Sequence, residues 1–281
     1  WHAGRAADAL PAFERTLALA EQDGDRYGAA VALSHIAIAE KALGRYERAL
    51  GLNVQALAME RELGNQRGVA SKLNNIGNLH RALGQWAEAQ RWFTEGLQHC
   101  RSYGLAAAAP YLRLNLGLAE TELGDHLSAQ AHLLAVLAEM RDAGQLQVQL
   151  SVELGLARIH LLLGDGAAAL ERLSRVVALS QAKAFHTHPV QAASIYGELL
   201  ASGGRRLQAA AIWCMASRQP ALDEMDRQGV QTLIERLALT AAEHAQAERD
   251  APTLAAVLAQ IAAAAAAAAP PRGNAKETPP T

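Results

Sequence analysis

The chain has 281 residues, of which 51% are hydrophobic and only 4% are aromatic. Its 26 Lys and Arg nearly balance its 28 Asp and Glu, and charges of both signs are interspersed along the chain. This balance excludes the basic surface of a nucleic-acid-binding protein, and the apolar content excludes a disordered chain. A composition dominated by Ala and Leu is typical of a helical protein.

Glycines recur every 40 residues along most of the chain, at Gly4, Gly44, Gly84, Gly124, Gly164 and Gly204. A second series half a period away contains Gly24, Gly64, Gly104 and Gly144, and is interrupted at Ala184. Because Gly adopts the left-handed conformation that ends many helices, this spacing predicts a turn at each glycine. The fold is therefore predicted to be all-α, with about thirteen or fourteen helices in antiparallel pairs.

Small residues mark where the two helices of each hairpin approach. In the first helix they are Ala37, Gly77, Gly117, Ala157 and Gly197, and in the second Ala49, Ala89, Ala129, Ala169 and Ala209. Large apolar residues precede the first set, at Ile36, Ile76, Leu116, Leu156 and Tyr196. A mid-helix Gly costs about 1 kcal/mol relative to Ala, so three at one repeat position indicate close helix packing.

These residues, with the aromatic positions in Gly44-Arg45-Tyr46 and Gly84-Gln85-Trp86, resemble the tetratricopeptide repeat (TPR) family over about residues 1–218. The 40-residue unit is similar to the long hairpins of kinesin light chains, bacterial peptide receptors and bacterial STAND-type signalling ATPases. The resemblance implies a right-handed superhelical solenoid of antiparallel helix hairpins, which binds partners on the concave face lined by the first helices. Residues 201–246 are similar to the closing part of large bacterial regulators, in which an effector and an ATPase module precede the repeats.

After Pro220 the repeat is lost, because Leu237 replaces the small residue and Arg249 replaces the second-helix Ala. A solenoid needs a terminal helix with a polar outer face. We expect a TPR solenoid over 1–220 (an unpaired second helix at 4–22, then five 40-residue hairpins), a capping helix over 221–250, an Ala-rich helix over 251–269 and a disordered tail over 270–281.

The chain begins at Trp1 with half a repeat, without Met and without the features of a signal peptide. We expect it to be part of a longer chain, and whether an effector or ATPase module precedes it stays open. Cys100 and Cys214 lie far apart and lack metal-ligand or redox spacing, as expected for reduced thiols of a cytoplasmic protein. The Ala-rich segment is too short and too weakly hydrophobic for a membrane span.

The sequence contains no convincing catalytic constellation. No Gly-Lys-Ser or Gly-Lys-Thr phosphate loop is present, so an ATPase activity of this chain is excluded. His186 and His188 lack the further ligands of a zinc site. Trp86, Trp92, Phe93 and Trp213 fall on repeat positions that face a neighbouring helix, which favours core packing over ligand stacking. We therefore expect no enzyme, no cofactor and no metal.

The predicted inward-facing rows of the first helices carry Ser34, Asn74, Leu114 and Leu154; His35, Asn75 and Asn115; Ile38, Asn78, Leu118 and Arg158; and Lys41 and Arg81. The asparagines are the most unusual polar feature, because buried Asn is scarce unless it is hydrogen-bonded. Their amides would either hold the backbone of an extended peptide or bridge adjacent helices, and the sequence leaves both readings open. The predicted peptide-binding residues are Asn74, Asn75, Asn78, Asn115, Arg81, Leu118 and Arg158, with the two arginines favouring an acidic residue in the ligand.

Two functional hypotheses follow. The first is a non-catalytic protein- or peptide-binding array that forms the sensor or scaffold portion of a bacterial signalling or transcriptional regulator. The alternative is a free-standing TPR adaptor in a multiprotein assembly. Neither involves nucleic acid or a membrane, and the partner and the oligomeric state are not specified by the sequence.

Overall fold

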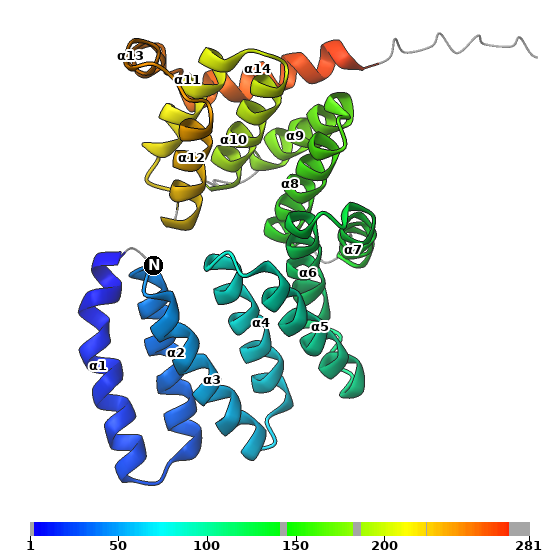
Figure 1. Cartoon of the computed structure of the whole chain (residues 1–281). Coiled ribbons are helices and arrows are strands. Elements are labelled where there is room, and N and C mark those ends of the chain that lie inside the picture. Colours follow the sequence, from blue (N-terminus) through cyan, green and yellow to red (C-terminus); the bar gives the residue numbers. More distant parts are fainter. Residues whose placement is uncertain (1–2, 141–144, 182–186, 223, 270–281) are drawn as a thin grey trace, which may run out of the picture. The chain divides into compact units, whose positions relative to one another are not determined.

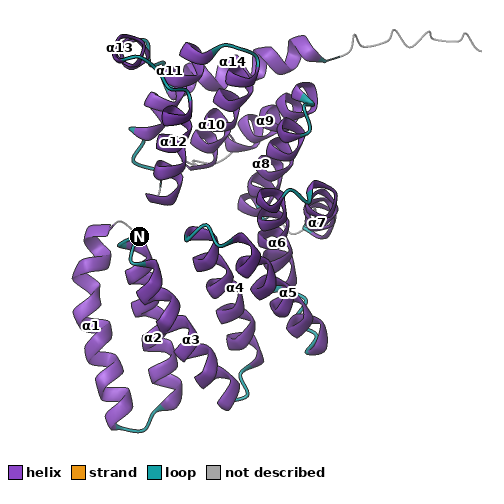
Figure 2. Ribbon diagram, viewed as in Figure 1, coloured by secondary structure: helices purple, strands orange, loops and turns teal. Residues whose placement is uncertain are grey.

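The computed structural model describes residues 3–140, 145–181, 187–222 and 224–269, and every regular element in these ranges is an α-helix (Figures 1 and 2). The all-α fold and the number of helices predicted from the repeat are confirmed. The fourteen helices of the described residues are α1 (Ala3–Gln22), α2 (Arg26–Ala42), α3 (Tyr46–Glu62), α4 (Gln66–Ala82), α5 (Trp86–Ser102), α6 (Ala109–Leu123), α7 (His126–Glu139), α8 (Leu146–Leu162), α9 (Gly166–Gln181), α10 (Thr187–Ser202), α11 (Arg206–Ser217), α12 (Glu224–Arg236), α13 (Ala241–Arg249) and α14 (Leu254–Ala268).

The turns between the repeat helices share one backbone design. Eight glycines have φ between +65° and +85°, namely Gly24, Gly44, Gly64, Gly84, Gly104, Gly124, Gly164 and Gly204. The residue after each glycine donates its N–H to the carbonyl five residues earlier, as Arg45 N does to Glu40 O at 2.9 Å. This bond satisfies one of the carbonyls left unpaired at a helix end.

Two glycines of the predicted series do not fit this description. Gly4 lies inside α1, so the turn predicted there is wrong; the helix already begins at Ala3, and a glycine in the first turn is tolerated. Gly144 lies outside the described residues, as does Ala184.

Several turns also start the next helix with a side-chain cap, which the glycine series did not predict. Asp25, Asn65, Asp125 and Asp165 each accept a hydrogen bond from the backbone N–H three residues ahead, at 2.8, 3.1, 3.2 and 3.0 Å. Hydrogen bonds from Ser128 lower the pKa of the Asp125 carboxyl. At these four turns the glycine ends one helix and the residue after it begins the next.

Packing divides the chain into two compact units, residues 1–155 and 156–281. In the N-terminal unit each helix from α1 to α6 packs against the next one in the chain (Figure 1). The large apolar row of the first helices and the alanine row of the second helices are buried as predicted, including Ile36, Ile76, Ala49 and Ala89. The periodic pattern therefore identifies the core of the repeat.

The small residues of the first helices make room for large side chains of the second. A Cβ added to Gly77 would lie 2.4 Å from Cε1 of Phe93, and one added to Gly117 would lie 3.2 Å from Cγ of Leu133. Phe93 is completely buried beneath the glycine. The row of small residues predicted from the sequence is thus a row of helix contacts.

The C-terminal unit uses the same contact but adds helices that leave the repeat. A Cβ on Gly197 would lie 2.5 Å from Nε1 of Trp213, whose indole N–H donates to the carbonyl of Ser194 at 3.0 Å. Helix α14 packs on two helices that precede it in the chain, α9 and α10, and its Val257 and Ile261 are fully buried (Figure 1).

The single capping helix predicted over 221–250 is wrong, because this segment contains α12 and α13. The chain leaves α12 through Ala238, which has φ +48°, and α13 starts with a reciprocal cap between Thr240 and Glu243. The Thr240 hydrogen bonds lower the pKa of the Glu243 carboxyl. Helix α14 lies within the predicted Ala-rich segment, whereas the predicted tail, 270–281, lies outside the described residues.

The predicted end of the array at residue 220 does not coincide with the division between the units. The helices α12 and α13 pack on α11, and α14 packs on α9 and α10. The last hairpins therefore share a core with the helices that follow them. No single helix among the described residues is long and apolar enough to cross a membrane; α13 and α14 meet that criterion only together, and they are bent by 92°.

Candidate functional site: the first-helix face

The predicted asparagines form a hydrogen-bonded network between two neighbouring first helices. Asn115 on α6 donates from Nδ2 to Oδ1 of Asn74 on α4, at 2.9 Å. Helices α4 and α6 are also in direct contact. The amides of Asn74 and Asn115 therefore bridge two successive hairpins, which is one of the two roles left open by the sequence.

Arg81 joins the same network. Its Nη1 atom donates to Oδ1 of Asn115 at 2.9 Å and to Oδ1 of Asn78 at 3.3 Å. The side chains of all four residues are partly buried. The guanidinium thus holds two amide oxygens of its own chain, so the predicted attraction of Arg81 for an acidic ligand is weakened.

Asn75 differs from the other three asparagines. It is half-buried on α4, and its side chain makes no hydrogen bond with the described part of the chain. Asn115 occupies the equivalent place one repeat later, yet only Asn115 is used as a bridge. The amide of Asn75 keeps both its donors and its acceptor for a partner.

The leucines predicted to line the groove are mostly covered. Leu114 and Leu154 are each 8% exposed. Leu118 packs over the next first helix, where a Cβ added to Gly155 would lie 3.0 Å from its Cδ2 atom. These side chains fill the contact between helices instead of forming open apolar pockets.

Arg158 belongs to the C-terminal unit and is engaged there. Its Nη1 atom lies 2.6 Å from Oε1 of Glu198, on the following first helix. Glu198 occupies the same repeat position as Arg158, 40 residues later. The acidic partner expected in a ligand is thus supplied by the chain itself.

Helix α2 carries exposed apolar side chains that are not among the predicted peptide-binding residues. Ile38, in the row of Asn78, is 44% exposed, and Tyr27, three turns earlier on the same helix, is 60% exposed. His35 is exposed as well and contacts the ring of Phe13, with 5.1 Å between the ring centroids. Tyr27 and Ile38 are eleven residues apart, a spacing of three helical turns that places both on one face of α2.

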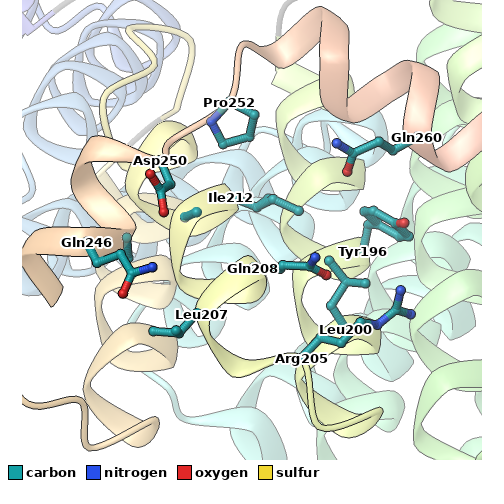
Figure 3. A pocket seen from close by; sticks show the side chains of 12 residues that line it. Tyr196, Leu200, Arg205, Leu207, Gln208, Ile212, Gln246, Asp250, Pro252 and Gln260 are labelled. Carbon is teal, nitrogen blue, oxygen red and sulfur yellow. The ribbon is translucent and has the colours of Figure 1, made fainter. Parts of the chain in front are cut away.

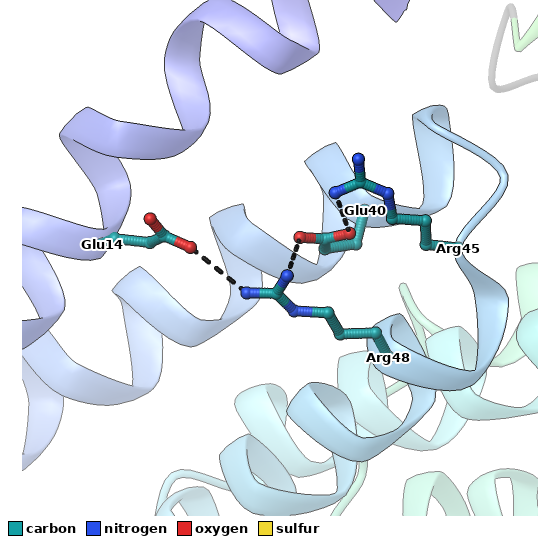
Figure 4. Close-up of polar contacts among 4 residues, drawn as sticks. All are labelled: Glu14, Glu40, Arg45 and Arg48. Carbon is teal, nitrogen blue, oxygen red and sulfur yellow. Dashed lines mark hydrogen bonds and ion pairs between the residues drawn. The ribbon is translucent and has the colours of Figure 1, made fainter.

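An ion cluster around the buried Glu40 joins the first three helices (Figure 4). Glu40 has no exposed surface, and its carboxylate oxygens lie 3.3 Å from Nη1 of Arg45 and 3.2 Å from Nη1 of Arg48. Arg48 also reaches Glu14 on α1, at 3.2 Å. Figure 4 shows the two arginines on either side of the Glu40 carboxylate. The cluster ties α1, α2 and α3 together.

Lys72 on α4 is a second buried charge missed by the sequence reading. It is 7% exposed and stands in a repeat row whose other members include Leu112 and Val152, both buried. Burial lowers the pKa of the Lys72 ammonium, while the nearby Glu60 carboxylate raises it. Glu60 accepts a hydrogen bond from Asn65 at 2.7 Å.

The other predictions of polar chemistry concern histidine and cysteine. No group of three His, Cys, Asp or Glu among the described residues is arranged to hold a metal ion. His186 lies outside the described residues, and burial lowers the pKa of His188. Cys100 and Cys214 are buried free thiols whose pKa is raised by burial. Phe93 and Trp213 are core residues, while Trp86 and Trp92 are half-buried.

Comparison with known proteins supports the repeat assignment. Family models described as tetratricopeptide repeat match residues 1–62 and 69–102. A solved structure, described as the crystal structure of BtubC (BKLC) from P. vanneervenii, has a TM-score of 0.57 at 16% sequence identity, over 83% of this chain and 91% of that chain. At this identity the likeness concerns the fold alone. A search of curated protein sequences finds no match.

These matches support tetratricopeptide repeats in the N-terminal unit and a protein-binding scaffold as the coarse function, and they indicate no catalytic family.

Proposed function

We propose that the chain is a non-catalytic array that binds an extended peptide segment of a partner protein, and that the site lies on the first-helix face of the N-terminal unit. The first-helix face comprises the inward rows of α2, α4 and α6, including His35, Ile38 and Asn75. The observation that carries the proposal is the contrast between Asn75, whose amide has no hydrogen bond within the described chain, and Asn115, whose amide is bonded on both sides.

The chemistry of this face suits an extended backbone. A primary amide can accept from a peptide N–H and donate to a peptide carbonyl at the same time. The exposed Ile38 side chain offers apolar contact to an alternate side chain of the ligand. The bridging network of Asn74, Asn115 and Arg81 holds α4 and α6 in register, and so fixes the surface on which the peptide would lie.

We further propose that the array is the sensor or scaffold portion of a bacterial signalling or transcriptional regulator in the cytoplasm. The likeness of residues 201–246 to the closing part of such regulators supports this reading. A free-standing adaptor of a multiprotein assembly is the second candidate, because a peptide-binding face would serve either role.

The test starts from peptides selected on the full chain from a random displayed library. Ile38→Asp should weaken the binding of a selected peptide by about tenfold or more, because a carboxylate would replace apolar contact area. Asn75→Ala should weaken it by about 1 kcal/mol through the loss of hydrogen bonds. Both variants should melt close to the parent temperature, since neither side chain bridges helices.

Two matched controls make this test specific. Val54 on the second helix α3 is 46% exposed, close to the 44% of Ile38, so Val54→Asp introduces the same charge on a different face. Asn115→Ala removes an amide at the equivalent repeat position, but it should lower the stability by about 1 kcal/mol because it breaks the bridge to Asn74. Equal loss of peptide binding in Ile38→Asp and Val54→Asp would contradict the proposed face.

A further inference from the structure

The C-terminal unit contains a cavity that has no part in the first-helix face. It has a volume of about 480 Å³ and is lined by residues of α10, α11, α13 and α14 (Figure 3). This volume falls in the range of about 300–1,000 Å³ that is common for small-ligand sites. The cavity exists because α13 and α14 leave the repeat geometry and pack at a new angle over the last hairpin.

The floor of the cavity is apolar. Leu200 of α10, Ile212 of α11 and Ala247 of α13 are all buried there. Tyr196 of α10 also lines the cavity and is only 6% exposed. Its hydroxyl makes no hydrogen bond with the described residues and is not itself buried. The floor therefore presents an apolar surface and one unused polar atom.

The rim of the cavity is polar and carries both signs of charge. Arg205, Asp250, Gln208, Gln246 and Gln260 all line it. None of their side chains makes a hydrogen bond or ion pair with the described part of the chain. In Figure 3 Arg205 and Asp250 lie on opposite sides of the cavity, with Ile212 and Gln208 between them.

Some carboxylates elsewhere are paired with an arginine, as Glu40 is with Arg48 and Glu198 is with Arg158. At the cavity a guanidinium and a carboxylate are held apart over an apolar floor, and neither satisfies the other. A ligand that bridges them must carry an anionic group at one end and a cationic group at the other.

We infer that this cavity binds a short peptide with free termini. The terminal carboxylate pairs with Arg205, which can bind it in the bidentate manner of a guanidinium. The terminal ammonium pairs with Asp250. The glutamine amides donate to and accept from the peptide backbone, and a central apolar side chain rests on Leu200 and Ile212.

The inference is tested by calorimetric titration of the full chain with the tripeptide Ala-Leu-Ala. Binding is expected at about 0.1 mM, the scale set by the number of ligand atoms. Amidation of the carboxyl end and acetylation of the amino end should each weaken binding about two- to fivefold, because each removes one charge pair at an exposed rim. Hexanoate and hexylamine, which carry one charge each, should bind more weakly than the tripeptide.

Variants assign each end of the peptide. Arg205→Gln should abolish the difference between the free and the amidated peptide, and Asp250→Asn should abolish the difference between the free and the acetylated peptide. Arg236→Gln on α12, which does not line the cavity, is the control for loss of a positive charge and should bind like the parent.

Two results would overturn the proposed peptide site. One is that neither Ala-Leu-Ala nor its analogues with Phe or Gln in the centre bind, and the other is that Arg205→Gln affects the free and amidated peptides equally. Binding of hexanoate as tightly as the tripeptide would also overturn it. Because Ile38→Asp should leave this binding unchanged, failure here is distinguishable from failure of the proposed first-helix face.

Discussion

The two units are built from the same hairpin, but they use their polar side chains in different ways. In the N-terminal unit, polar groups on neighbouring helices bond to each other, as Asn115 does to Asn74 and Glu40 does to Arg48. Around the cavity of the C-terminal unit, Arg205 and Asp250 have no partner in the described chain. The four N-terminal residues connect neighbouring helices, whereas Arg205 and Asp250 at the cavity connect none.

The largest expected effect concerns the contact between a small residue of a first helix and a large side chain of the second helix. This kind of contact occurs within each of the two units. Gly77→Leu should destabilise the protein by about 3 kcal/mol, because even a Cβ would overlap the Phe93 ring. Gly197→Leu should cost a similar amount through Trp213. Gly117→Leu should cost about 1–3 kcal/mol, since the space there is less tight. Thermal and urea unfolding followed by circular dichroism measures these changes.

Glycines without a neighbour provide the control for this prediction. Nothing lies within 4 Å of a Cβ added to Gly51 in α3 or to Gly229 in α12. Gly51→Ala and Gly229→Ala should therefore stabilise the protein by about 0.5–1 kcal/mol, because Ala favours the helix. If Gly77→Leu were as stable as the parent, the assignment of the small-residue row to the helix contact would be wrong.

The second expected effect concerns the connectors of the N-terminal unit. Glu40→Ala should lower the free energy of unfolding by about 2 kcal/mol, less than for a fully buried pair because Arg45 and Arg48 are 56% and 55% exposed and can be rehydrated. Glu62→Ala is the matched control, because Glu62 pairs with Arg26 and both side chains are more than half exposed. It should cost less than about 0.5 kcal/mol. If Glu40→Ala and Glu62→Ala lowered the free energy of unfolding in urea equally, Glu40 would not stabilise the packing of α1, α2 and α3.

The smallest expected effect is a pH dependence in the C-terminal unit. Burial lowers the pKa of His188 from its usual 6.5 in the folded state. Above that pH the imidazole is neutral in both states and contributes nothing; below it the unfolded chain binds the proton first, so stability falls as the pH falls. His188→Gln should give a flatter stability profile on the acidic side of pH 6.5. An unchanged slope in melts over this range would contradict the prediction.

The periodic part of the fold could be predicted because helix ends and close helix contacts each impose a residue type at a fixed interval. The boundary between α12 and α13 could not be predicted in this way. It depends on the left-handed conformation of Ala238 and on the Thr240 cap, neither of which is part of the periodic pattern. The site was predicted only in outline. Asn75 and Asn115 occupy the same repeat position. Only Asn115 bridges two helices, because Asn74 and Arg81 on the neighbouring helix α4 lie within hydrogen-bond distance of its amide.

Glu40 could not be identified from the sequence as a buried charge. Its partners are Arg45, the N-cap residue of the next helix, and Arg48 in the first turn of that helix. Glu14 is a further 34 residues from Arg48. A pair within one helix would have shown a spacing of three or four residues. The cavity of the C-terminal unit was equally hidden, since two of the helices that line it, α13 and α14, lie outside the repeat.

The shared backbone design of the turns limits how the chain can change in length. Turn glycines recur every 20 residues from Gly24 to Gly124, whereas the contact of Gly77 with Phe93 belongs to a 40-residue unit. One inserted residue would rotate the buried face of the following helix by about 100°. Insertion of 20 residues would keep the buried face of each following helix. It would, however, place a first helix where a second helix is needed, and the reverse. Only steps of 40 residues preserve both, so duplication or loss of whole hairpins is the change in length that this architecture tolerates.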